Sequence, residues 1–82
     1  MLTEYISAAM HKAHYEFLPN DKVYYAEIDG FQGVYASAST LEECRDELNS
    51  VLEDWILFSI SKGFKLPVIN NLSLEIKEYE EV

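Results

Sequence analysis

Residues 40–62 carry the pattern that most restricts the fold, because they predict one long helix with a face that must be covered. Thr40 and Glu43 fit a capping box, in which the threonine hydroxyl accepts from the Glu43 amide and the glutamate side chain returns to the cap. Gly63 supplies a stop, with Pro67 beyond it. At about 100° per residue, one sector holds the side chains expected to pack on a sheet: Leu41, Cys44, Leu48, Val51, Leu52, Trp55, Phe58 and Ser59.

The segment before this helix, residues 13–39, predicts three antiparallel strands. The first ends at the turn cluster 19–21, and residues 23–29 and 34–39 alternate between apolar and polar or small side chains as half-buried strands do. Gly30 and Gly33 bracket the second connection, where glycine can adopt a positive φ or form a bulge. The small side chains of the third strand leave room for the long helix to lie close against it.

The two flanks complete the expected architecture. Residues 1–12 predict an N-terminal helix, with its body at 3–12, because apolar side chains recur at helical spacing. Alternation within 71–78 predicts a last strand. We therefore expect one α+β domain over residues 1–82, in which an N-terminal helix precedes a β-β-β-α-β core and a three- to four-stranded sheet is backed by one long helix.

The side of the long helix opposite its apolar sector is acidic. The chain has 15 acidic and six basic residues, a net charge of −9, which opposes binding to nucleic acid phosphates and anionic lipid and favours a basic partner. A run of acids is often only a solvated face. The alternative is a surface that recognises a basic partner, formed by Glu42, Glu43, Asp46, Glu47, Glu53 and Asp54.

The second half of the long helix is apolar nearly all round. Ile56, Leu57 and Ile60 lie on the sector that is acidic one or two turns earlier, so this half needs a second cover in addition to the sheet. Either the N-terminal helix or a second copy of the chain could supply it. We therefore take these three residues as candidate contacts in a homo-oligomer.

Residues that could support catalysis or bind a metal do not converge in the sequence. Cys44 lies on the apolar sector and is expected to be a core residue rather than a reactive thiol. His11 and His14 have no evident third ligand, and Glu42 and Asp46 make an ordinary exposed pair. We expect no catalytic residues, no metal and no cofactor. The N-terminus does not resemble a signal peptide and no apolar run could span a membrane, so a cytoplasmic location is expected.

Several short motifs together resemble the HicB family of antitoxins. They are Tyr24-x-Ala26-x-Ile28, Gly30-Phe31-x-Gly33-Val34, Thr40-Leu41-Glu42-Glu43-Cys44 and the segment Gly63 to Pro67. The resemblance covers residues 14 to about 76. It implies a truncated ribonuclease H-like core without the metal-binding carboxylates of those enzymes. It also implies a partner, a small basic RNA-cleaving toxin of the HicA type, whose RNA surface the antitoxin blocks.

The chain departs from the family pattern at several positions. Asp29 and Gln32 stand where prolines are frequent, and Ala38-Ser39 replaces a frequent Gly-Asp. We expect no appended DNA-binding segment of the kind that many family members carry, and the N-terminal helix is similar to that of small single-domain members, so direct nucleic acid binding is not expected. An antitoxin-like protein that masks a toxin and self-associates is the first hypothesis. A solitary scaffold or regulatory protein with an unrelated partner is the second, and a metal-dependent nuclease is a third.

Overall fold

The structure, a computed structural model, describes residues 2–69, which form two helices and three strands. The elements follow the order α1 (Leu2–Met10), β1 (Ala13–Leu18), β2 (Val23–Ile28), β3 (Tyr35–Ala38) and α2 (Leu41–Lys62). This order confirms the α+β prediction, although α1 ends at Met10 rather than at residue 12. The predicted last strand, residues 71–78, lies outside the described residues.

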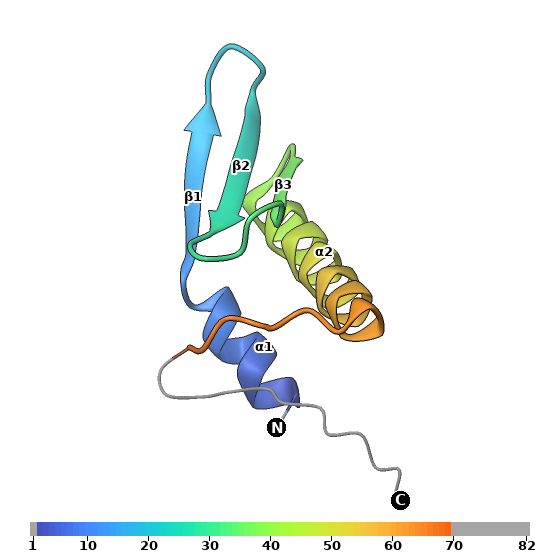
Figure 1. Cartoon of the computed structure of the whole chain (residues 1–82). Coiled ribbons are helices and arrows are strands. Elements are labelled where there is room, and N and C mark those ends of the chain that lie inside the picture. The colour runs from blue at the N-terminus through green and yellow to red at the C-terminus, as the bar shows by residue number, and fades with distance from the viewer. Residues whose placement is uncertain (1, 70–82) are drawn as a thin grey trace, which may run out of the picture.

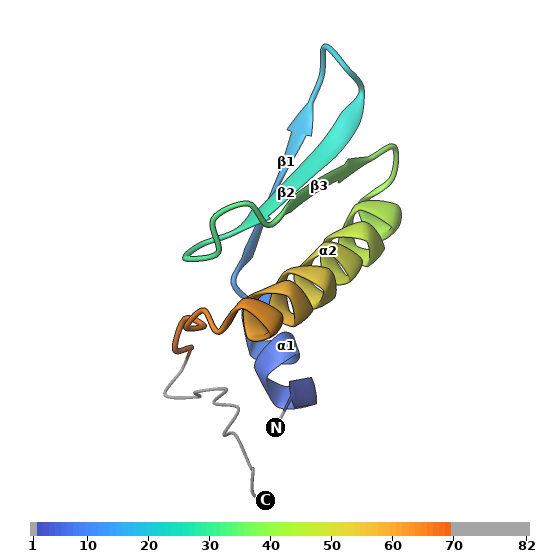
Figure 2. The ribbon, with the colours of Figure 1, turned by 45° about the vertical axis from the view of Figure 1, so that its right-hand side comes forward.

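The three strands form one antiparallel sheet in the order β1-β2-β3. Figure 1 shows the β1–β2 hairpin projecting past the first turn of α2, and Figure 2 shows α2 on one face of the sheet with α1 near the opposite end of that helix. Gly30 and Gly33 adopt φ values of 84° and 90°, so the β2–β3 connection requires the left-handed conformations that favour glycine. Both glycines therefore serve the turn that the sequence predicts.

The helix-facing side of the sheet is lined by small side chains where α2 crosses it. Ala26 and Ala36 pair across β2 and β3, and their side chains are 0% and 5% exposed. The Cys44 thiol of α2 donates to the Ala36 carbonyl at 3.7 Å, which shows how near the helix backbone approaches the strand. The alanines thus allow a close contact that larger side chains would prevent.

Both ends of α2 are capped much as the sequence predicts. The Thr40 hydroxyl accepts from the Glu43 amide at 3.1 Å, whereas the Glu43 carboxylate accepts from the Ser39 hydroxyl at 3.0 Å. Of the two hydrogen bonds of a capping box, the one accepted by the Thr40 hydroxyl is therefore present. The Glu43 carboxylate bonds to Ser39, the residue before the cap, instead of to the cap itself. Gly63 has φ 72°, and its N–H donates to the Ile60 carbonyl at 3.1 Å, which ends the helix.

The buried stripe of α2 differs in part from the predicted one. Cys44, Leu48, Leu52 and Ser59 are buried as expected. Ile56, predicted for the second face, is only 1% exposed, whereas Leu41 and Phe58 are 48% and 54% exposed instead of buried. The sheet and α1 both pack against α2 in the core. The buried stripe of α2 is therefore displaced around the helix toward Ile56 and away from Phe58. Leu41 is in the first turn, at the end of the stripe farthest from α1.

An aromatic contact chain joins α1 to the rest of the core. The Tyr5 ring lies 6.3 Å from Phe31 in the β2–β3 connection, and Phe31 lies 5.1 Å from Trp55 of α2, both edge to face. The Tyr5 hydroxyl donates to the carbonyl of Pro67, in the segment that follows α2, and burial raises the Tyr5 pKa. Tyr5 thus ties the first helix to the segment after the last one, which Figure 1 shows running past α1.

Replacing Leu52 by alanine should destabilise the protein strongly. Leu52 is 0% exposed at the centre of the buried stripe, so the Leu52→Ala variant should lose about 2–5 kcal/mol of unfolding free energy. The matched control is Leu41→Ala, because Leu41 is 48% exposed in the same helix and should lose less than about 1 kcal/mol. Urea unfolding followed by circular dichroism measures both values, and equal losses would contradict the placement of the stripe.

Candidate functional site

The side of α2 away from its buried stripe presents an acidic surface to solvent between residues 42 and 54. The acidic surface is defined by six carboxylates, all of them exposed, as the sequence predicts for the side away from the apolar stripe: Glu42, Glu43, Asp46, Glu47, Glu53 and Asp54. They share one side of α2 because the buried stripe occupies the opposite side of the same helix. Two of them, Glu42 and Glu43, are in the first turn, where the positive end of the helix dipole favours negative charge.

The carboxylates of the acidic surface are hydrogen-bonded locally but not neutralised. Glu43 accepts from Ser39, and Glu53 accepts from the Asn49 amide at 3.0 Å. Within residues 2–69, none of the six forms an ion pair with a lysine or arginine. Among the described residues, no lysine or arginine pairs directly with the acidic surface, and its six side chains are exposed to solvent.

A shallow groove runs between β3 and the acidic half of α2. It has a volume of about 390 Å³ and is lined by Ser37, Ala38, Glu43, Asp46, Glu47 and Ser50. Three members of the acidic surface thus form one wall of the groove, and strand β3 forms the other. Glu42, Glu53 and Asp54 do not line it.

The three candidate oligomer contacts lie in different environments. Ile56 is 1% exposed within the core of one chain, so it is not a surface contact, and this part of the expectation is corrected. Ile60 is half-buried against the core, and Leu57 is 62% exposed. The sequence left open whether α1 or a second copy of the chain covers this half of α2. In the structure, α1 lies beside Ile56, whereas Leu57 remains exposed.

Apolar side chains remain exposed around Leu57. A groove of about 190 Å³ between α1 and α2 is lined by Leu2, Ile6, Glu53, Ile56, Leu57 and Ile60. At the end of α2, Phe58 and Phe64 contact each other edge to face at 6.2 Å between ring centroids, although each is more than half exposed. The second half of α2 and the residues just after it thus expose several large apolar side chains.

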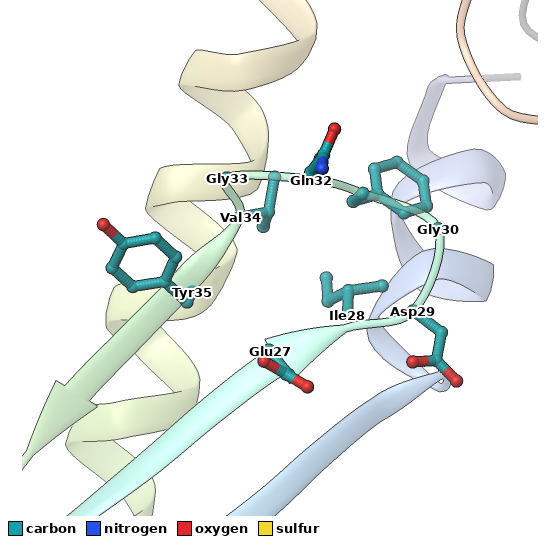
Figure 3. Close-up of a pocket in the computed structure, with 9 residues that line it drawn as sticks. Glu27, Ile28, Asp29, Gly30, Gln32, Gly33, Val34 and Tyr35 are labelled. Carbon is teal, nitrogen blue, oxygen red and sulfur yellow. The ribbon is translucent and has the colours of Figure 1, made fainter.

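A hollow of about 460 Å³ lies within the β2–β3 connection and is shown in Figure 3. Ile28 and Val34 point into the loop and are 3% and 1% exposed, so its interior belongs to the hydrophobic core. The carboxylates of Glu27 and Asp29 are engaged elsewhere, with the Tyr25 hydroxyl and the His14 ring respectively. No set of catalytic groups converges on this hollow among the residues that line it.

The remaining reactive side chains are isolated or buried. Cys44 is fully buried, and desolvation raises the pKa of its thiol, which disfavours the reactive thiolate. His14 contacts Asp29 at 3.1 Å with both side chains well exposed. Over residues 2–69, no group of three histidine, cysteine or acidic side chains is arranged to hold a metal ion. Neither described helix is long and apolar enough to cross a membrane.

The comparisons with known proteins agree with this architecture. The UPF0150-like family matches the chain over residues 4–67, a span that includes the sheet, α2 and most of α1. The chain belongs to the UPF0150-like family. This family is related to HicB-like antitoxins. Comparison with curated proteins gives no significant match.

A solved structure resembles this UPF0150-like protein over nearly its whole length. The crystal structure of TTHA0281 from Thermus thermophilus has a TM-score of 0.87 and 38% sequence identity. The similarity covers 94% of this chain and 95% of that chain. The two proteins therefore share the fold.

One polar feature of this UPF0150-like fold was not predicted. On the sheet face away from α2, the rings of Tyr25 and Tyr35 stack at 6.3 Å, and the Tyr25 hydroxyl donates to Glu27 at 2.9 Å. This hydrogen bond, first among several causes, raises the pKa of Tyr25. The alternation that places Tyr25 and Tyr35 on the outer face was visible in the sequence, but their pairing depends on strand register.

Proposed function

We propose that this protein is an antitoxin-like binding protein that masks a small basic RNA-cleaving toxin of the HicA type and has no enzymatic activity of its own. The observation that carries the proposal is the acidic surface, whose six exposed carboxylates form no ion pair within the described chain. Membership of a family related to HicB-like antitoxins supports the same context. The fold similarity to TTHA0281 supports the architecture only.

The mechanism follows from competition between carboxylates and phosphates. An RNA-cleaving protein holds its substrate through lysines and arginines that pair with phosphate oxygens. Carboxylates accept the same charge-assisted hydrogen bonds, and arginine binds either group in a bidentate manner. A helix of 22 residues extends about 33 Å, so its acidic half alone could span several cationic side chains. Occupation of those side chains by the acidic surface would leave no site for RNA.

The uncompensated charge is otherwise unfavourable for the isolated protein. Like charges on one helix repel one another, and the net charge of −9 adds to that repulsion. A basic partner would relieve it, because complementary charges raise the association rate and select the partner. The acidic surface is thus better explained by binding than by stability.

Capture of the partner from the source cells tests this function. Tagged protein should retain a small basic protein at about 0.05 M salt, and the affinity should fall by about tenfold or more at 0.5 M salt, since exposed charges are screened. Binding of the isolated partner at several salt concentrations gives the slope, and a cleavage assay shows whether its RNA cleavage stops on binding. A captured protein that is neither basic nor active on RNA would favour a solitary scaffold instead, and salt-independent binding would contradict the charge mechanism.

We also propose that the protein self-associates through the apolar end of α2. Leu57 is 62% exposed beside the groove between α1 and α2, and Ile60 lines the same groove. Exposed apolar side chains of this size in one place are typical of contact surfaces. A contact there would involve Glu53, which lines the same groove, but would leave free the three carboxylates beside β3, Glu43, Asp46 and Glu47.

The Leu57→Glu variant separates self-association from folding. Because Leu57 is largely exposed, the variant should fold with a midpoint within a few degrees of the parent protein, while its mass in solution falls toward that of one chain. Ser61→Glu is the matched control, since it adds the same charge at an exposed position one turn away without removing an apolar side chain. Multi-angle light scattering measures the molar mass of the parent protein and of both variants in solution. An unchanged mass for Leu57→Glu would reject this contact.

A further inference from the structure

Within residues 2–69, β3 is an edge strand of the sheet. Residues Tyr35–Ala38 pair with β2 along one edge. In an antiparallel strand, every second residue turns its N–H and C=O groups away from that partner. Within residues 2–69, no strand pairs with these groups on the other side of β3. An edge of this kind is a template for an incoming strand.

The groove beside this edge has the charge that selects the incoming strand. Its helical wall contains three exposed carboxylates, Glu43, Asp46 and Glu47, and its other wall is formed by Ser37 and Ala38 of β3. Both ribbon views place β3 alongside the first half of α2, and the Cys44–Ala36 contact fixes them together (Figures 1 and 2). A strand that pairs with β3 would therefore lie along a row of negative charge.

We propose that an extended basic segment of the partner adds to the sheet as a strand beside β3, with alternate lysine or arginine side chains on the carboxylates of the groove. This inference rests on the proposed function, because it takes the partner to be basic, and it adds the mode of binding. The main-chain hydrogen bonds of β3 supply affinity, and the carboxylates of α2 supply selectivity.

The spacing of the carboxylates along α2 matches the spacing of side chains along an extended segment. Side chains on the same side of a strand recur every two residues, about 6.6 Å apart. Carboxylates four residues apart on a helix, such as Glu43 and Glu47, are separated by about 6 Å along its axis. Successive basic side chains on one side of the incoming strand can therefore meet successive carboxylates.

A second copy of the chain does not fit this edge. Pairing between two β3 strands would bring two acidic grooves together, and like charges in close contact are unfavourable. None of the strands β1, β2 and β3 of this chain contains a lysine or arginine that could face the groove. Among the described strands, the charge of the groove thus disfavours a second copy and favours a basic segment of a partner.

Synthetic peptides test the proposal on the whole protein. The probe is a ten-residue peptide that alternates lysine and threonine, and the control has the same composition with its lysines in one block. At low salt, the alternating peptide should bind about fivefold more tightly or better by calorimetry. A third peptide has the alternating sequence but carries N-methyl groups on the backbone amides that would face β3. It should lose most of that binding, because it cannot donate hydrogen bonds to the strand. In amide hydrogen exchange, the amides of residues 35–38 should be protected only by the first peptide.

Two double variants locate the charge effect. Asp46→Asn with Glu47→Gln removes two groove charges, and Glu42→Gln with Glu53→Gln removes two charges of the acidic surface outside the groove. The first pair should weaken peptide binding by about five- to thirtyfold, since exposed ion pairs are individually modest, and the second by less than about twofold. Thermal melts of both pairs check that the fold is retained.

The outcomes separate this inference from the proposed function. Equal losses in the two double variants, no selective protection of β3, or no preference for the alternating peptide would overturn strand addition. A toxin that binds with full affinity to the groove variant would overturn it while the antitoxin function stands. Conversely, selective peptide binding in the groove by a protein that captures no basic toxin would support the site and reject the function.

Discussion

The packing of one stripe of α2 on small side chains of the sheet is the contact on which the other features depend. Leu48 and Leu52 are fully buried, and Ala26 and Ala36 leave room for the helix to approach β2 and β3. A chain of 82 residues buries only about 60 to 65% of the surface its unfolded form exposes, so the loss of one such contact is a large fraction of its stability. The orientation of α2 is consequently well determined.

This orientation decides where charge and apolar surface can lie. With one sector of α2 fixed toward the core, the carboxylates of its first half must face solvent, and Leu57 in its second half faces solvent as well. The proposed toxin contact and the proposed self-contact thus lie on the same helix, and they meet at Glu53, which belongs to the acidic surface and lines the groove beside Leu57. The carboxylates beside β3, Glu43, Asp46 and Glu47, lie outside that groove and stay free when it is occupied.

Much of this arrangement could be predicted from local sequence signals, because caps, glycines and alternation act over a few residues. Thr40 and Gly63 mark the ends of α2 through contacts within one turn, and Gly30 and Gly33 permit the positive φ angles of the β2–β3 connection at no steric cost. Such features depend little on how distant segments pack.

The errors concern features that depend on tertiary contacts. The positions of Ile56 and Phe58 were exchanged between buried and exposed, because helical periodicity gives the width of a stripe but not its exact centre when α1 and the sheet share the cover. The stacking of Tyr25 on Tyr35 and the groove between β3 and α2 required the register and the approach of separate elements. The acidic surface was predicted residue by residue, whereas its division between groove and open helix was not.

The central claim is that the acidic surface serves binding and not folding. The most direct test measures unfolding free energy and partner affinity together in one variant in which the four carboxylates beyond the first turn, Asp46, Glu47, Glu53 and Asp54, are replaced by amides. We expect a stability equal to or above that of the parent protein, because like-charge repulsion is removed, together with loss of toxin binding. A variant that is clearly less stable and still binds the toxin with the parent affinity would contradict the account.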